Sequence, residues 1–239
     1  YWERLASDSM LDDQCTLGGK NPHGDRFVDV EHLEQMQIPV DHTRARVLDA
    51  GAGYGRFAIP IAKKCELVVA VDLSLSMIGR LKRNAKVHGV KGQIDVIRAD
   101  IRRLPFRHGC LDGIVCSATF YYLPKQHWYD ALQSFSDMLR TDGWLLVTFK
   151  DVRTAFRLRF GFGLLYLAAY VVLKSESRSS LLRSLSRRFG LHGRTEYLVT
   201  KRRATKLLSI FFTQVVSTGS PTSTYICKGP HIRMERGSD

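Results

Sequence analysis

The chain has 239 residues, of which 44% are hydrophobic and 25% are charged, and its net charge is +13. This is the composition of an ordinary globular protein, long enough to bury a sizeable core as one domain or as one domain with an insertion. Its five cysteines form no C-x-x-C pair and no metal-ligand spacing, which argues against a disulfide framework or a metal site and favours reduced thiols in a cytoplasmic protein.

Strand and helix patterns alternate from residue 44 to about residue 150. Before them, residues 1–43 are polar and mixed, with helical patterns at 1–6 and 31–36 and a loop around 18–25. Alternation of strands with helices predicts a parallel sheet covered on both faces. The predicted strands are 46–50, 67–71, 93–98, 111–117 and 143–149, and the predicted helices are 56–64, 75–88 and about 126–140.

Residues 151–194 interrupt this alternation. An uncharged run at 160–173 is flanked by basic residues, and as a helix it would span about 21 Å, which is short of the ~30 Å hydrocarbon core of a membrane. Residues 178–189 have the pattern of a basic amphipathic helix. We interpret the stretch as a helical insertion that forms a lid over the substrate side; plain core packing is the alternative for the apolar run.

The alternation resumes at residue 195 and continues to residue 229. Thr200 is expected to be the N-cap of a helix at 201–210, followed by strands at 212–216 and 223–227. The tail at 230–239 is polar and expected to fray. Residues 1–150 hold 20 Lys/Arg and 18 Asp/Glu (net +2), whereas residues 151–239 hold 16 and 5 (net +11), which favours an anionic partner for the last third over a merely solvated basic face.

Three acidic residues end three successive predicted strands. Asp49 closes the first and is followed by three alternating glycines, Asp72 closes the second about nineteen residues past Gly53, and Asp100 closes the third. Glycine permits close backbone approach and positive φ, and a helix that opens after such a turn directs free N–H groups at a ligand. The βαβ spacing places Asp72 where a carboxylate accepts hydrogen bonds from ribose hydroxyls. The pattern predicts a nucleoside-binding crevice.

Five segments together resemble the class I S-adenosylmethionine-dependent methyltransferases of the small-molecule type. The resemblance covers about 44–150 closely and 195–229 loosely. It is carried by the glycine segment 49–55, by 72–77, by Asp100-Ile101, by the fourth strand at 111–117, and by the turn 139–143 before the fifth strand.

This resemblance implies a fold and a set of domains. The fold would be α/β, a Rossmann-like doubly wound sheet of seven strands, mostly parallel, with strand seven antiparallel between five and six, plus the helical lid. Residues 44–150 and 195–229 would form the core. Residues 1–43 would be a helical cap over the cofactor crevice, in which Tyr1 and Trp2 either line the substrate pocket or are packed aromatic residues.

The resemblance also implies a cofactor, S-adenosylmethionine, with S-adenosylhomocysteine as the product. Asp72 would hold the ribose, Asp100 would accept from the adenine amine, and Asp49 would orient the ammonium group or, alternatively, cap the turn. The backbone of the glycine segment would approach the methionine moiety. The full set of implied cofactor-binding residues is Asp49, Gly51, Ala52, Gly53, Asp72, Leu73, Met77, Asp100, Ile101 and Ser117.

The reacting methyl should face the segment 117–124 after the fourth strand, where no general base is evident. The candidates for catalytic residues are Tyr121, Tyr122 and His127. A tyrosine would orient or deprotonate a substrate hydroxyl, although a phenol with a pKa of about 10 is a poor base. The alternative interpretation makes both tyrosines packing residues and makes His127 a helix-capping or solvent-facing residue.

Three functions are consistent with these features. The first is methyl transfer to an apolar small-molecule or lipid-like acceptor in the lidded pocket, with residues 155–190 at a membrane surface. It is favoured because segment 117–124 lacks the Asn/Asp-Pro-Pro-aromatic signature of base amino methyltransferases and a Pro-Cys nucleophile. The second is methylation of tRNA or rRNA bound by the basic C-terminal third. The third is a non-catalytic binding or assembly module. The basic residues of the second hypothesis are Arg183, Arg187, Arg188, Lys201, Arg202, Arg203 and Lys206.

Overall fold

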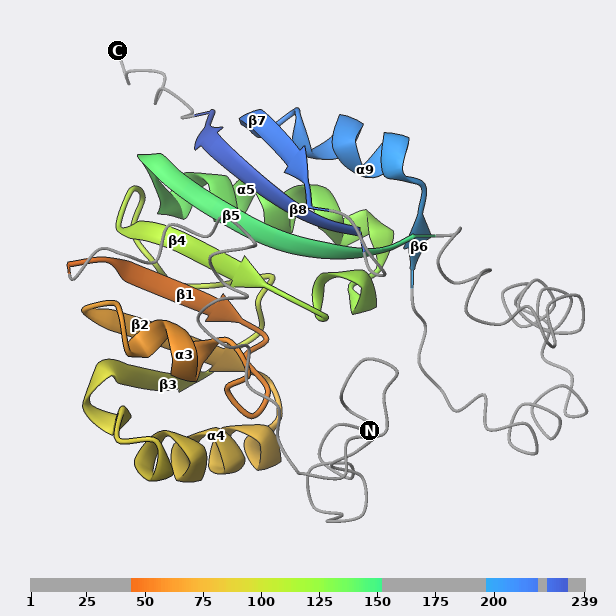
Figure 1. Cartoon of the computed structure of the whole chain (residues 1–239). Helices are drawn as coiled ribbons and strands as arrows, with labels where there is room; N and C mark the ends of the chain where they lie inside the picture. Colours follow the sequence, from red (N-terminus) through yellow and green to blue (C-terminus); the bar gives the residue numbers. More distant parts are fainter. Residues whose placement is uncertain (1–43, 152–196, 219–222, 232–239) are drawn as a thin grey trace, which may run out of the picture.

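The computed structural model describes residues 44–151, 197–218 and 223–231 (Figure 1). The expected cap at 1–43, the lid at 151–194 apart from its first residue, and the tail at 230–239 apart from its first two residues lie outside the described residues. Within the described ranges, no helix has the length and apolar character needed to cross a bilayer.

A single twisted sheet forms the centre of the described chain. Its strands lie in the order β3-β2-β1-β4-β5-β8-β7, with β1 at the middle of a parallel set that runs from β3 to β5. The parallel strands are β1 (Arg46–Ala50), β2 (Leu67–Asp72), β3 (Ile94–Arg98), β4 (Leu111–Cys116) and β5 (Leu139–Asp151).

The far end of the sheet is an antiparallel hairpin. β8 (Ser223–Pro230) lies between β5 and β7 (Phe212–Ser217) and runs antiparallel to both. This confirms the predicted seven-stranded arrangement with the last strand inserted and reversed. The sequence did not predict β6 (Leu198–Val199), a two-residue strand that pairs with Lys150 and Asp151 at the end of β5.

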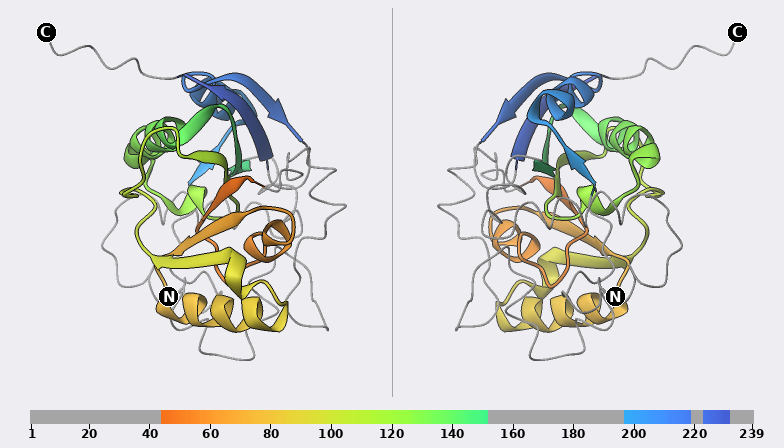
Figure 2. Two further views of the ribbon diagram at one scale, coloured as in Figure 1. Left: turned by 90° about the vertical axis from the view of Figure 1, so that its left-hand side faces the viewer. Right: turned by 90° about the vertical axis from the view of Figure 1, so that its right-hand side faces the viewer.

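Helices cover both faces of the sheet, as Figure 2 shows. α3 (Ala58–Ala62) and α4 (Leu75–Val87) pack on the face that carries Val47, Val68 and Val115. α5 (Trp128–Met138) and α9 (Lys201–Leu208) pack on the other face, against Leu48 and Ile114 among others. Because strand side chains alternate between faces, β1, β2, β4, β5 and β8 supply residues to both layers of the core.

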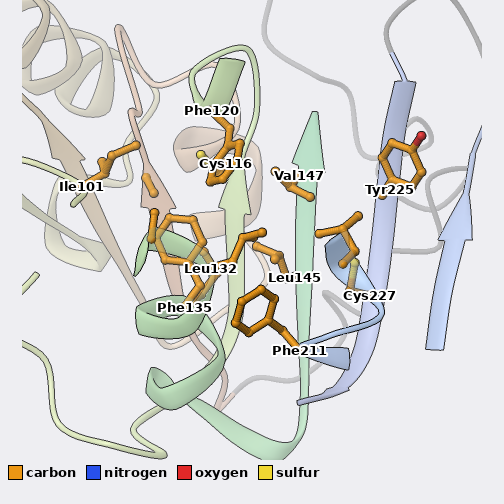
Figure 3. Close-up of a cluster of buried hydrophobic side chains, with 14 of the residues drawn as sticks. Ile101, Cys116, Phe120, Leu132, Phe135, Leu145, Val147, Phe211, Tyr225 and Cys227 are labelled. Carbon is orange, nitrogen blue, oxygen red and sulfur yellow. The ribbon is translucent and has the colours of Figure 1, made fainter. Parts of the chain in front are cut away.

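A cluster of aromatic rings joins α5 to the sheet beside the carboxyl end of β4 (Figure 3). The Phe149 ring lies edge-on to Phe120, Trp128 and Tyr225, with ring centroids 5.2, 5.3 and 5.7 Å apart. Edge-to-face pairs of this kind add to the hydrophobic gain of burial. They fix Phe120, and with it the segment that follows β4.

Two helices begin later than the sequence predicted. α3 begins at Ala58 rather than at 56, because residues 53–57 form turns. α5 begins at Trp128 rather than near 126, after the 3₁₀ turns Phe120–Tyr122 and Lys125–His127. Pro124 restricts the residue before it to extended conformations, which separates the two turns. The predicted N-cap of α9 is confirmed, since the Thr200 side chain accepts from the Arg203 N–H, although the helix ends at Leu208 and not at 210.

The fifth strand begins earlier than predicted. The predicted turn at 139–143 is part of β5, which starts at Leu139 directly after α5. Leu111 pairs with Leu139 and Gly113 pairs with Trp144, so a bulge takes up the additional residues of β5. Gly113 is required here, because a Cβ at this position would lie 2.3 Å from the Trp144 indole.

Candidate functional site

A pocket of about 240 Å³ lies where the carboxyl ends of β1, β2 and β4 meet the segment after β3. This is the edge at which ligands bind in open α/β sheets. All ten residues that the sequence analysis assigned to cofactor binding line it. The other lining residues, not singled out from the sequence as cofactor-binding, are Tyr54, Arg56, Phe57, Ala99, Ala118, Thr119, Tyr122 and Leu123.

The loop between β1 and α3 forms the floor of the pocket and depends on glycine. Gly51 has φ +85°, and a Cβ there would lie 2.3 Å from the Thr119 side chain. Gly53 has φ +55°, and a Cβ there would meet no atom of the described residues within 4 Å. Gly51 is therefore needed for packing against the segment after β4, whereas Gly53 leaves open space in the pocket.

The amide groups of this loop are bound to β2. The N–H groups of Gly51 and Ala52 both donate to the Val71 carbonyl oxygen, at 2.8 and 2.9 Å. The Gly53 N–H donates to Asp72 Oδ2 at 2.8 Å. These three amides are therefore bound to the end of β2.

Asp72 ends β2 and is half-buried at the pocket. Besides the Gly53 amide, its carboxylate accepts the Ser74 N–H on Oδ1 at 2.9 Å. An ionised carboxylate has about four lone-pair sites, so a group of this kind accepts several hydrogen bonds at once. The Asp72 side chain holds the glycine loop in place through the Gly53 amide and is also a hydrogen-bond acceptor in the pocket lining.

Asp100 is held by Arg102, a contact that the sequence analysis did not anticipate. Arg102 Nε donates to both carboxylate oxygens, at 3.0 and 2.9 Å, and its amide donates to Oδ1 at 3.0 Å. These side-chain hydrogen bonds keep the pKa of Asp100 below its usual value. Asp100 is therefore ionised at physiological pH. A hydrogen-bond donor of a ligand would share the Asp100 carboxylate with Arg102.

Asp49 is buried at the end of β1, and its Oδ2 accepts the Ala58 N–H at 3.0 Å. This is the capping contact that the sequence analysis gave as the alternative, and the side chain also lines the pocket. Burial raises the pKa of Asp49 to about 7, the Ala58 hydrogen bond opposes the rise, and the charge of Asp72 adds to it.

The segment after β4 forms the opposite wall. Ala118 has φ +55°, unusual for a residue with a Cβ, and its N–H donates to Thr148 Oγ1 at 2.6 Å. Thr119 Oγ1 lies 3.2 Å from the carbonyl oxygens of Gly51 and Ser117 and donates there. Thr119 thus ties this wall to the glycine loop. No local pattern identifies it, because Gly51 and Thr119 are 68 positions apart.

The three candidate catalytic residues occupy different environments. Tyr122 lines the pocket. Tyr121 is buried outside the pocket lining, with its ring centroid 4.6 Å from that of Tyr122 and Lys150 Nζ 5.8 Å from its ring. His127 is at the N-cap position of α5, makes no side-chain cap hydrogen bond, and is not part of the pocket lining. Only Tyr122 of the three is positioned to touch a ligand there.

A family model described as a methyltransferase domain matches residues 47–143, which contain the glycine loop and the tips of β2, β3 and β4. The matched segment, residues 47–143, belongs to the methyltransferase-domain family, in agreement with the family expected from the motifs.

The curated and solved proteins that this chain resembles are distant relatives. The tRNA 5-carboxymethoxyuridine methyltransferase of Escherichia coli (strain K12) is 36% identical over 67 residues, which are 28% of this chain and 26% of that protein. The chain thus matches about a quarter of the length of this relative.

Two solved structures show the same fold. The PH0226 protein from Pyrococcus horikoshii OT3 has a TM-score of 0.61 at 20% identity, over 84% of this chain and 89% of that one. Haemonchus contortus phosphoethanolamine N-methyltransferase 1, solved with phosphoethanolamine and S-adenosylhomocysteine, has a TM-score of 0.50 at 21% identity, over 63% of this chain and 31% of that one.

The buried Asp49 should make the stability of this protein depend on pH. The folded state holds the Asp49 proton up to about pH 7, whereas an unfolded aspartate releases it near 3.8, so stability present below about pH 4 is lost as the pH rises to about 7. Asp49→Asn keeps an acceptor for the Ala58 amide but does not titrate. Urea unfolding at about pH 5 and about pH 8 should show the wild type losing stability relative to Asp49→Asn as the pH rises. Identical pH dependence in the two proteins would contradict the assignment.

Proposed function

We propose that this chain transfers the methyl group of S-adenosylmethionine to an apolar small-molecule or lipid-like acceptor, by in-line displacement in its pocket. The observation that carries the proposal is that the ten residues expected to bind the cofactor, drawn from four strand ends far apart in the sequence, line one pocket. Acidic side chains line this pocket beside apolar ones, and this combination suits a nucleoside, which has an apolar base and hydroxyl and amine donors.

The residues of the pocket fit this cofactor. Asp72 lines the pocket at the end of β2, where a carboxylate accepts hydrogen bonds from ribose hydroxyls. Leu73, Met77 and Ile101 provide apolar surface for the adenine ring, and Asp100 provides an acceptor for its amine. The space beside Gly53 admits the methionine moiety. Asp49 and Ser117 line the part of the pocket in which its ammonium group would lie.

When bound, this cofactor supplies a methyl group on a positively charged sulfur, already activated for displacement. The contribution of the chain is to hold the acceptor in line and to exclude water, and positioning of this kind supplies about 7–11 kcal/mol of the barrier reduction in favourable cases. Tyr122 is the side chain of the wall after β4 that we assign to orienting an acceptor hydroxyl. Tyrosine is a poor general base, so its phenol serves here as a hydrogen-bonding group.

We propose an apolar acceptor because apolar side chains line the pocket wall that the segment after β4 forms. Tyr122 and Leu123 line this side, and the hydroxyl of Thr119 is already engaged with Gly51 and Ser117. The segment Ser117-Ala-Thr-Phe120 has no proline pair to grip a planar base nitrogen. These features suit a hydrophobic molecule with one nucleophilic atom.

Methylation of RNA is the second candidate, and one feature of the described surface favours it. Lys201, Arg202 and Arg203 are exposed in the first turn of α9. This turn follows β6, which pairs with the carboxyl end of β5, so it lies at the same edge of the sheet as the pocket. The Tyr197 N–H also donates to the Tyr121 carbonyl oxygen at 2.8 Å, which joins this region to the wall after β4. The similarity to a tRNA methyltransferase supports this candidate as well.

Asp72→Ala should weaken binding of S-adenosylhomocysteine about 10- to 100-fold, because it removes charge-assisted hydrogen bonds to the ribose. Isothermal titration calorimetry measures the affinity. Asp95→Ala is the matched control, since Asp95 is an exposed acid on the neighbouring strand β3 and lies outside the pocket lining. Unchanged affinity in Asp72→Ala would refute the ribose assignment, and a wild type that does not bind the compound would leave only the non-catalytic module.

The acceptor class is tested by supplying radiolabelled S-adenosylmethionine with a lipid extract and with total RNA. The proposal expects label in the lipid fraction, at equal rates for the wild type and for Arg202→Glu/Arg203→Glu. The control is Lys86→Glu/Lys91→Glu, which reverses two exposed charges on the side of the sheet where β3 begins. Label in RNA that is lost in the α9 variant and kept in the control would overturn the lipid proposal and establish the second candidate.

A further inference from the structure

Arg56 is a basic residue in a pocket that is also lined by three acidic residues. It follows Gly55 in the loop between β1 and α3, and among the described lining residues it is the one with a cationic side chain. Its Nε is shielded from solvent and has no hydrogen-bond partner among the residues that the structure describes. The guanidinium lies over the Phe57 ring, with Cζ 5.9 Å from the ring centroid.

An unpartnered buried N–H is costly to a folded protein. Leaving such a donor unsatisfied costs about 1–3 kcal/mol, and more when the group is charged. Native structures seldom keep such groups unless a ligand or water satisfies them. The guanidinium is also the side chain best matched to a carboxylate, which it binds through two parallel N–H donors. Arg56 therefore points to an anionic group on the ligand.

The acids that line the pocket already have partners of their own. Asp100 is held by Arg102, Asp72 by two amides, and Asp49 by the Ala58 amide. The last contact places Asp49 under the loop segment that carries Arg56, two residues before Ala58. The end of β1 and the loop after it thus present to the pocket a carboxylate and a guanidinium, which together complement the ammonium and carboxylate of an α-amino acid.

We propose that Arg56 binds the carboxylate of the methionine moiety of the cofactor. The proposal rests on the proposed function and assigns a partner to a residue of the same pocket. The carboxylate belongs to the cofactor rather than to the acceptor, because Arg56 is on the loop after β1 and the acceptor is assigned to the wall after β4. Arg56 is then the residue that distinguishes the amino-acid cofactor from the bare nucleoside.

Two ligands distinguish binding of the carboxylate by Arg56 from a general effect of an Arg56 substitution on the pocket. S-adenosylhomocysteine carries the amino-acid carboxylate, and 5′-methylthioadenosine has the same nucleoside thioether without it. Arg56→Met retains apolar contact with Phe57 and removes the charge. By calorimetry, it should bind S-adenosylhomocysteine about 10- to 100-fold more weakly than the wild type, with affinity for methylthioadenosine changed less than about twofold. Arg56→Lys should recover part of the loss.

The controls make the outcomes distinct. Asp72→Ala should weaken both ligands alike, because both carry the ribose. The melting temperature of unliganded Arg56→Met should equal or exceed that of the wild type, since the variant removes an unsatisfied donor. Equal weakening of both ligands by Arg56→Met, or no weakening of either, would overturn the assignment of Arg56 while the proposed function stands. A wild type that binds neither ligand would instead overturn the proposed function, and this inference with it.

Discussion

The connection between the tip of β2 and the glycine loop after β1 determines the shape of the pocket. The Val71 carbonyl oxygen accepts two successive amides of the loop, and the Asp72 carboxylate accepts the third. With these donors satisfied inside the protein, the loop keeps the positive φ angles of Gly51 and Gly53 without needing a ligand. The pocket is therefore largely formed before the cofactor arrives, which limits the ordering cost of binding.

Packing on the two faces of the sheet holds the remaining wall in place. The rings of Phe120, Trp128 and Phe149 fix the segment after β4 against α5 and β5. Thr119, next to Phe120, then connects that segment to Gly51. The hydrophobic core thus positions the site directly, because a residue of the core and a residue of the pocket are neighbours in the chain. A change in the core at Phe120 would shift the wall on which the acceptor is proposed to bind.

Much of the fold follows from the sequence because its causes are local. The strands and helices of the core have regular apolar spacing, and Asp49, Asp72 and Asp100 each follow a run that the spacing identifies as a strand. What the sequence did not reveal depends on residues far apart. The Thr119–Gly51 contact, the early start of β5 through its bulge opposite Leu111, and the pairing of β6 arise only once the sheet is assembled. The unpartnered Nε of Arg56 is likewise a property of the packed loop and not of the glycine motif.

The account depends most on the assignment of Asp72 to a ribose. A crystal structure of the chain with S-adenosylhomocysteine tests this directly. It should show the ribose hydroxyl oxygens within about 2.5–3.0 Å of the Asp72 carboxylate oxygens, while the Gly53 and Ser74 amides keep their present bonds to the same group. A ligand bound away from the carboxyl ends of β1 and β2, or one whose ribose makes no contact with Asp72, would contradict it.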